Sequence, residues 1–457
     1  MQSFDAAALA HAYEGTLRPV DVVEEALARI ARRGDDGVWI ELAPRDGLLA
    51  AARDLPQRRA AGESLPLYGL PFAVKDNIDV AGLPTTAACP AYSYSPVADA
   101  TSVRLLLDQG AIAVGKTNLD QFATGLVGTR SPYGAPESVF GGDLISGGSS
   151  SGSAVAVAAG SVAFALGTDT AGSGRVPAAL NGIVGLKPTR GLVSTAGVVP
   201  ACRSLDCVSV FANDLDDAQL VLAALAGPDP ADPWSRVPKV ATRRTESGNS
   251  PFEGVPRIET RRRENPDSAW VVGVPADPGL ADAGFAEAFR RVVGRVDARP
   301  VPLEPLFEAG DLLYDGPWVA ERLAGVAEFF ATHPEDVLPV TRAVIERGRE
   351  FDAVACFRAR HRLQELRAWA ERLWTRVDAL LLPTIPTTFT RAQLAAEPVA
   401  HNRTLGRFTQ FTNLLDLAAV AVPAGTTADG RPFGVTLHGP AFTEDRLISA
   451  ARRLEAA

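Results

Sequence analysis

Two clusters of serine and glycine, with an apolar stretch between them, constrain the fold of this chain more than any other feature of its sequence. Residues 147–153 read GGSSSGS, and residues 169–175 read DTAGSGR. The stretch between them is interrupted by Gly160 and Ser161 and falls short of the ~18 apolar residues that a membrane span needs. We therefore expect a buried helix and strand here, flanked by glycine-rich turns that hold helices close to a sheet.

The rest of the chain alternates between helical and strand-like segments. Apolar residues at helical spacing predict a helical hairpin over residues 3–33, a helix over 102–109 and helical structure over 307–376. Short apolar runs predict buried strands at residues 70–74, 111–114, 208–211, 379–383, 417–423 and 433–437. This alternation is typical of an α/β fold with a mixed central β-sheet covered by helices on both sides.

One segment breaks this pattern. Residues 235–268 are rich in Arg, Glu, Ser, Gly, Asn and Pro and hold few large apolar side chains. This composition predicts an exposed loop or a disordered insertion, to which no function can be assigned. We expect residues 1–457 to form a single domain, with no accessory domain at the C-terminus.

The composition disfavours several classes of function. The net charge is −9, and the one basic stretch is a short arginine cluster at residues 261–263, so nucleic-acid binding through a basic surface is disfavoured. The N-terminus lacks the basic start and apolar core of a signal peptide. The cysteines are Cys89, Cys202, Cys207 and Cys356. Their spacing predicts neither a disulfide framework nor a zinc site, which favours a reducing, cytoplasmic setting.

Two familiar patterns are weakened by their context. Residues 110–117 match the P-loop for nucleotide phosphates, but a helix is expected before Gly110 and the middle residues are strand-like, so few free N–H groups would remain for a phosphate. Ser150 stands at the centre of a G-x-S-x-G nucleophile elbow, which requires a later acid and histidine. Among the five histidines, His438 alone has a suitable position, so a Ser-His-acid hydrolase stays open.

A lysine upstream of the two clusters changes their interpretation. Lys75 follows the strand expected at residues 70–74, where burial would lower the pKa of its ammonium group and let it act as a base. A serine between this lysine and a nucleophilic serine could pass a proton in both directions. The small residues Thr170, Ala171 and Gly172 leave backbone N–H groups free to face a developing oxyanion. Amide hydrolysis needs a base, a nucleophile and donors for the oxyanion, and these residues could supply all three without a histidine.

Lys75 and the two clusters resemble the amidase signature family, in which a Ser-cisSer-Lys triad is catalytic. The spacings also fit that family. Lys75 and Ser149 are 74 positions apart (149 − 75), and Ser149 and Ser173 are 24 positions apart (173 − 149). The resemblance implies that Ser173 is the nucleophile, that Ser149 in a cis peptide relays the proton, and that Lys75 is the base and later the acid. The oxyanion hole that it implies consists of the N–H groups of Thr170, Ala171, Gly172 and Ser173. It implies no metal and no organic cofactor.

Residues beside the predicted nucleophile narrow this resemblance to the amidase domain of allophanate hydrolases. Ala171 replaces the first of two glycines that commonly precede the nucleophile, and Gly174 replaces a β-branched residue. Residues 118–125 and 200–207 are similar to that domain as well.

A tyrosine and an arginine hold the substrate in allophanate hydrolases, and Tyr314 and Arg322 match their separation, 322 − 314 = 8. Allophanate is a small urea-like amide that ends in a carboxylate, which an arginine can grip through two parallel hydrogen bonds. By themselves these residues fit a core tyrosine and a surface arginine on an amphipathic helix equally well.

The sequence therefore predicts an amidohydrolase that cleaves the terminal amide of allophanate, a small anionic substrate, and releases ammonia. The resemblance also implies a homodimer. Allophanate hydrolases commonly carry a C-terminal domain that helps to break down the first product, whereas this chain ends at Ala457. A separate protein would complete the breakdown, or the second step is spontaneous, or the substrate is a related ureide. Two alternatives stay open: an amidase acting on another small amide or ureide, and an amidotransferase subunit of a tRNA-dependent complex.

Overall fold

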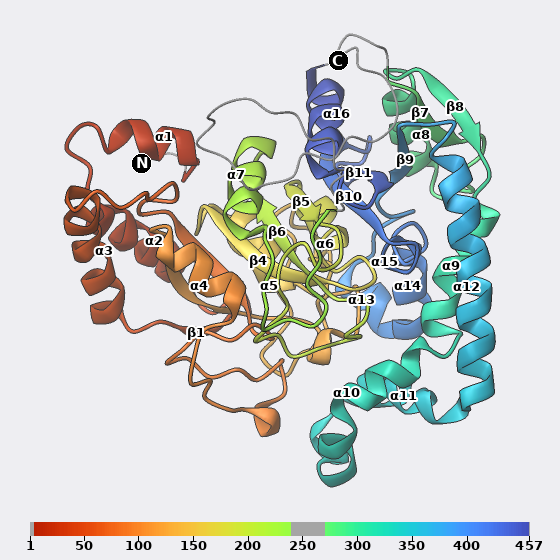
Figure 1. The fold of residues 1–457 in the computed structure, drawn as a ribbon, viewed down its shortest axis with the longest axis horizontal. Helices are drawn as coiled ribbons and strands as arrows, with labels where there is room; N and C mark the ends of the chain where they lie inside the picture. The colour runs from red at the N-terminus through yellow and green to blue at the C-terminus, as the bar shows by residue number, and fades with distance from the viewer. Residues whose placement is uncertain (1–3, 239–269, 457) are drawn as a thin grey trace, which may run out of the picture.

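An eleven-stranded sheet runs through the protein, and helices cover it (Figure 1). The computed structural model describes residues 4–238 and 270–456. The strands are β1 (Trp39–Leu42), β2 (Pro71–Lys75), β3 (Ile112–Thr117), β4 (Phe164–Asp169), β5 (Val184–Lys187), β6 (Cys207–Ala212), β7 (Val272–Pro275), β8 (Ala298–Val301), β9 (Ala379–Pro383), β10 (Leu417–Thr426) and β11 (Pro432–Pro440). Their order across the sheet is β1-β3-β2-β4-β6-β5-β10-β11-β9-β7-β8.

The sheet is mixed, as predicted. Strand β2 lies parallel to β3 and β4, and β7 lies parallel to β8 and β9. The pairs β1–β3, β4–β6, β5–β6, β5–β10, β10–β11 and β9–β11 are antiparallel. Strands that are distant in sequence thus become neighbours. For example, β2 and β4 pair although α4 (Thr101–Asp108), β3 and α5 (Ser151–Ala158) lie between them in the chain.

The helices are α1 (Ala6–Ala12), α2 (Pro19–Arg33), α3 (Arg45–Ala60), α4 (Thr101–Asp108), α5 (Ser151–Ala158), α6 (Val176–Asn181), α7 (Leu215–Leu225), α8 (Ala283–Val293), α9 (Glu304–Tyr314), α10 (Trp318–Thr332), α11 (Pro339–Glu346), α12 (Ala353–Leu373), α13 (Arg391–Ala396), α14 (Pro398–Leu405), α15 (Phe411–Leu414) and α16 (Glu444–Ala456). Of these, α1, α2, α4, α5 and α9–α12 fall in segments that were predicted to be helical, and the others were not predicted. In Figure 1, α1–α3 lie at one edge of the molecule and α12 runs along the opposite edge.

Alternate side chains of the strands enter two different cores, which explains why helices cover both faces. In β2 and β4, Phe72 and Phe164 stack with their ring centroids 5.1 Å apart in one core, whereas Ala73 and Ala165 belong to another. Successive residues of a strand point to opposite faces of the sheet. Helix α5 supplies the second core, and α4, α7 and α16 supply the first. The predicted α/β class is confirmed.

The predictions missed some boundaries and some short strands. The helical segment 307–376 is divided into α9–α12, with Pro317 directly before α10 and Pro339 at the first position of α11. Proline is favoured at the start of a helix and disfavoured in its interior, which accounts for these breaks. Strands β1, β5, β7 and β8 have four residues each and were too short to detect. The predicted insertion lies outside the described residues except for residues 235–238.

No helix within residues 4–238 and 270–456 combines the length and apolar character that crossing a membrane requires. The apolar stretch between the two Ser/Gly clusters folds into α5 and β4, as predicted, and both are buried.

Candidate active site

Lys75 lies at the C-terminal end of the fully buried strand β2. Its Nζ atom donates hydrogen bonds to Ser149 Oγ at 2.8 Å and to Thr168 Oγ1 at 2.7 Å. Burial lowers the pKa of Lys75 to about 7, although the carboxylates of Asp120 and Asp169 act in the opposite direction. Much of this lysine is therefore neutral near pH 7, which is the state that can accept a proton.

Ser149 is fully buried in the loop that precedes α5, and the peptide bond Gly148–Ser149 is cis. An added Cβ atom at Gly148 would lie 2.7 Å from the amide nitrogen of Gly128 and would contact the carboxylate of Asp120. Only glycine fits there. The backbone carbonyl of Ser149 accepts a hydrogen bond from the amide of Asp120 at 3.0 Å. These contacts hold the loop so that the Ser149 hydroxyl faces Lys75.

Ser173 lies in the turn between β4 and α6 and is 3% exposed. The carboxylate of Asp169 organises this turn, because it accepts hydrogen bonds from the amides of Gly172 at 2.8 Å and Gly174 at 3.0 Å. It also accepts from Nε and Nη2 of Arg175, at 2.9 and 3.0 Å. Burial alone would raise the pKa of Asp169, but the Arg175 guanidinium holds it below its usual value. A fully buried ion pair thus shapes the backbone around Ser173.

Backbone N–H groups beside Ser173 supply the donors that an oxyanion needs. The amides of Thr170, Ala171 and Ser173 donate to no acceptor among residues 4–238 and 270–456. The prediction for Gly172 was wrong in this conformation, since its amide donates to Asp169 instead. Gly172 has a φ of 134°, a backbone conformation that favours glycine, and in this conformation its amide faces the Asp169 carboxylate. Three of the four predicted donors stay free.

The C-terminal part of the chain fixes the carbonyl groups of the same turn. Thr409 Oγ1 donates to the carbonyl of Ala171 at 2.7 Å. Asn413 Nδ2 donates to the carbonyls of Asp169 at 2.7 Å and Leu205 at 2.8 Å. Hydrogen bonds to the carbonyls of Asp169 and Ala171 fix the orientation of the peptide groups in this turn. The free N–H groups of the same turn therefore keep one orientation.

Arg322 of α10 and Tyr314 at the end of α9 lie beside this centre. Arg322 is 2% exposed, its Nη2 donates to the Tyr314 hydroxyl at 3.4 Å, and its Nη1 donates to Thr124 Oγ1 at 3.1 Å. The charge of Arg322 contributes to the lowered pKa of Lys75 and acts downward on the pKa of Asp206. The interpretation of Arg322 as a surface arginine was wrong. It is buried, and it makes no ion pair with any described residue.

The two competing motifs have structural roles. Ser150 Oγ donates to the carbonyl of Thr168 at 3.1 Å, and no hydrogen bond joins it to His438 within the described residues. His438 is fully buried in β11 and packs against Phe411, and burial keeps its pKa far below the usual value. The P-loop match lies in β3, where Lys116 Nζ stands 2.9 Å from Asp76 Oδ1. A buried ion pair leaves this lysine unable to bind a phosphate.

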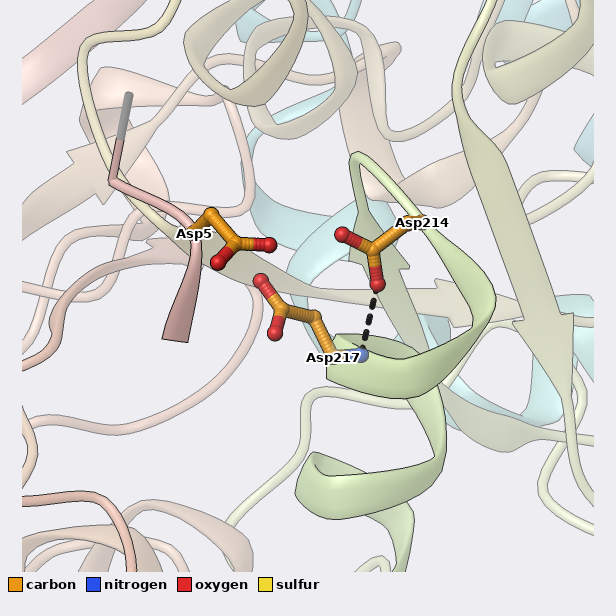
Figure 2. Close-up of side chains that lie close together, drawn as sticks. All are labelled: Asp5, Asp214 and Asp217. Carbon is orange, nitrogen blue, oxygen red and sulfur yellow. Dashed lines mark hydrogen bonds between the residues drawn. The ribbon is translucent and has the colours of Figure 1, made fainter. Parts of the chain in front are cut away.

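A group of three acidic side chains lies elsewhere, at the N-terminal helix (Figure 2). Among the described residues, Asp5, Asp214 and Asp217 are the one set that could hold a metal ion. These carboxylates already accept backbone hydrogen bonds, from Ala8 to Asp5 at 2.7 Å and from Ala6 to Asp217 at 3.2 Å. We interpret them as helix caps that attach α1 to α7.

Several residues of the site were not predicted individually. Asp169 and Arg175 lie within the second Ser/Gly cluster, so the motif pointed to them without giving their role. Thr168, Thr409 and Asn413 had no sequence signal. They reach the site through strand pairing and packing over long sequence separations.

Comparisons with known proteins bear on the family and the fold of this chain. The family model described as amidase matches residues 21–448. A urea amidolyase of Lachancea kluyveri is 45% identical over 432 residues, which cover 92% of this chain but 22% of that protein. The chain therefore spans about a fifth of the length of such relatives. A glutamyl-tRNA(Gln) amidotransferase subunit of Symbiobacterium thermophilum is 35% identical over 96% of this chain and 93% of its own length.

Solved structures show the same fold. The selenomethionine-substituted allophanate hydrolase of Kluyveromyces lactis superposes with a TM-score of 0.86. It is 41% identical, and the match covers 97% of this chain and 71% of that one.

Proposed function

Because this chain belongs to the amidase family of amide C–N hydrolases, we propose that it cleaves the terminal amide of allophanate (urea-1-carboxylate) and releases ammonia. Two of its relatives carry the names allophanate hydrolase and urea amidolyase. One observation carries the choice of an anionic substrate: Arg322 is buried beside the site with no carboxylate partner among the described residues. A buried guanidinium is costly unless a counter-charge compensates for it.

Ser173 is the nucleophile in this proposal. Its hydroxyl attacks the terminal amide carbon and passes its proton to Ser149, while the Ser149 proton moves to neutral Lys75. The hydrogen bond from Lys75 to Ser149 and the lowered pKa of this lysine support that route. The developing oxyanion accepts hydrogen bonds from the free N–H groups of Thr170 and Ala171.

The proton then returns along the same path. Protonated Lys75 and Ser149 deliver it to the departing nitrogen, the C–N bond breaks, and ammonia leaves an acyl group on Ser173. Water attacks this acyl group with Lys75 again as base, which frees the serine and the dicarboxylate product. Each bond that forms is matched by one that breaks, and no further reactant is required.

Tyr314 and Arg322 bind the substrate carboxylate in this scheme. The Arg322 guanidinium supplies the charge, and the Tyr314 hydroxyl, 3.4 Å from Nη2, limits its orientation. The substrate amide is thereby placed at a set distance from Ser173, which turns binding energy into proximity.

The rival proposal is an amidotransferase subunit, which the 35% identical relative supports. Such a subunit would need partners for activity on free small amides. We test both by measuring ammonia from the purified chain with allophanate, biuret, malonamate, acetamide and glutamine. Rapid release from allophanate supports the hydrolase, whereas release from none of these amides would refute it.

Two serine variants test the site. Ser173→Ala should abolish ammonia release, and full activity in this variant would exclude Ser173 as the nucleophile. Ser150→Ala is the matched control from the competing elbow motif. It should keep most of the activity, because Ser150 binds backbone atoms of Thr168.

We also propose that the chain acts as a homodimer in the cytoplasm and that a separate protein completes the breakdown of the product. The resemblance to allophanate hydrolases supports these points. Light scattering on the purified chain measures the first, and product analysis with the chain alone tests the last.

A further inference from the structure

A second buried guanidinium that makes no ion pair with any described residue accompanies Arg322. Arg130 is 4% exposed, and its Nη1 and Nη2 atoms donate to the carbonyls of Thr124 at 3.0 Å and Pro398 at 2.9 Å. The two fully buried ion pairs among the described residues, Lys116–Asp76 and Arg175–Asp169, involve neither arginine. Two cations without an ion-pair partner therefore lie in one interior region.

Thr124 connects these two arginines. Its backbone carbonyl accepts from Arg130, and its hydroxyl oxygen accepts from Arg322 Nη1 at 3.1 Å. The same hydroxyl donates to the carbonyl of Phe122 at 3.1 Å, so its single proton is committed and its lone pairs face Arg322. Thr124 is 1% exposed.

The turn that carries Thr124 needs support. Phe122 and Ala123, within the short helix Gln121–Ala123, both have φ of 51°, a left-handed conformation that non-glycine residues rarely adopt. Arg130 holds the end of this turn by the Thr124 carbonyl and ties it to the start of α14 at Pro398. Its backbone also takes part, because the amide of Gln121 donates to the Arg130 carbonyl at 2.7 Å.

Counting donors shows what is left on Arg322. The two hydrogens on Nη1 meet Thr124 Oγ1 and, at 3.5 Å, the carbonyl of Ala123, and one hydrogen on Nη2 meets Tyr314. Nε has no acceptor among the described residues. Nε and Nη2 share one edge of the guanidinium, the edge that a carboxylate accepts side-on, and Nε on this edge is unpaired among the described residues.

Neither guanidinium is neutralised by an ion pair among the described residues. The carboxylate of Asp120 acts on the pKa of Arg130, but its oxygens accept the amides of Val127 at 3.0 Å, Gly128 at 3.1 Å and Arg130 at 2.9 Å. Burial lowers the pKa of Arg130, with a further contribution from the charge of Arg322. A bound carboxylate would compensate for these two like charges.

We propose that Thr124 and Arg130 are positioning residues that orient Arg322 and restrict the site to amides bearing a carboxylate. This inference rests on the proposed function and adds to it the residues that set selectivity. Thr124 occupies one edge of the Arg322 guanidinium and leaves the other for the substrate. Arg130 holds Thr124 in place and adds a second positive charge.

Binding to catalytically silent protein tests this proposal independently of turnover. In a Ser173→Ala background, calorimetry measures Kd for malonamate and for malonamide, which has an amide in place of the carboxylate. Thr124→Val keeps the shape of the side chain but removes the hydroxyl, and it should weaken malonamate binding about tenfold, as expected for a lost hydrogen bond to a charged group. Malonamide binding should change less than about twofold, because it has no carboxylate for Arg322 to bind. Thr124→Ser restores the hydroxyl and should restore malonamate binding.

Arg130 is tested in the same way. Arg130→Met should weaken malonamate binding about tenfold or more, because it removes a buried charge and its hydrogen bonds. Arg130→Lys keeps the charge and should lose less. Arg104→Met removes the same charge from an exposed ion pair with Asp108 on α4 and is the control for overall charge. If Arg130→Met fails to fold in thermal melts, the Thr124 pair decides the question.

The outcomes separate this proposal from the function. Equal losses for malonamate and malonamide in Thr124→Val would overturn it, because a purely structural defect affects both. The proposal would also be overturned if the Ser173→Ala protein bound malonamate no more tightly than malonamide. If the carboxylate preference and its loss are observed but allophanate yields no ammonia, the proposed function alone is wrong.

Discussion

Replacing Lys75 by methionine should abolish turnover and at the same time make the protein more stable at neutral pH. The lysine is fully buried, and burial lowers its pKa from 10.5 to about 7. In the unfolded chain it takes up a proton below pH 10.5, but in the folded protein only below about pH 7. Keeping this amine uncharged in the folded state therefore opposes folding.

The size of the effect follows from the shift. A change of 3.5 pH units (10.5 − 7) corresponds to about 5 kcal/mol in favour of unfolding at pH 7 and below. Methionine removes this term but also the hydrogen bonds to Ser149 and Thr168, which contribute about 1 kcal/mol each. The net expectation is a gain of about 2 to 3 kcal/mol in the free energy of unfolding.

The pH dependence gives the sharper test. Between about pH 7 and 10.5 the unfolded wild type binds more protons than the folded one, so its stability rises with pH in this window. The advantage of Lys75→Met should therefore shrink by about 3 kcal/mol from pH 6.5 to 9.5, as measured by urea unfolding. Ser149→Ala, which keeps the lysine, should keep the wild-type slope.

The pH dependence of the activity should also reflect the titration of Lys75. The acidic limb of the kcat/KM profile for wild type should have an apparent pKa near 7, because only neutral Lys75 accepts the proton. A stability advantage of Lys75→Met that is independent of pH, or an acidic limb far below pH 7, would refute the reasoning.

Three further changes have defined outcomes. Asp169→Asn leaves Arg175 unpaired in the interior and should cost about 3 to 5 kcal/mol in urea unfolding, with a large fall in kcat; a loss under 1 kcal/mol would contradict the role given to this ion pair. Arg322→Ala should raise KM for allophanate about a hundredfold but leave KM for biuret nearly unchanged, and equal effects on both substrates would exclude carboxylate binding. Burial, together with Asp214, raises the pKa of Asp217 to about 7, so the folded protein binds more protons than the unfolded chain from about pH 4 to 7, and its stability falls as pH rises. Asp217→Asn should remove this fall, and an unchanged pH dependence in urea unfolding would contradict it.

Local sequence was sufficient for the elements whose signals are local. The apolar run before Lys75 predicted a buried strand, and β2 is buried at every residue. The glycine-rich clusters predicted tight turns, and the close approach at Gly148 leaves no room for a Cβ atom. The amidase family was predicted from Lys75 and the two clusters, and the match over residues 21–448 confirms it.

The sequence by itself thus determined the α/β class and the family, because hydrophobic periodicity and glycine-rich turns act within a few positions. Tertiary structure alone decided the surroundings of the predicted site residues. Thr409 reaches the Ala171 carbonyl across 238 positions, and Arg322 reaches Thr124 across 198. Such contacts follow from how strands pair and helices pack, which no local pattern encodes. The same packing buried Arg322 without an ion-pair partner among the described residues.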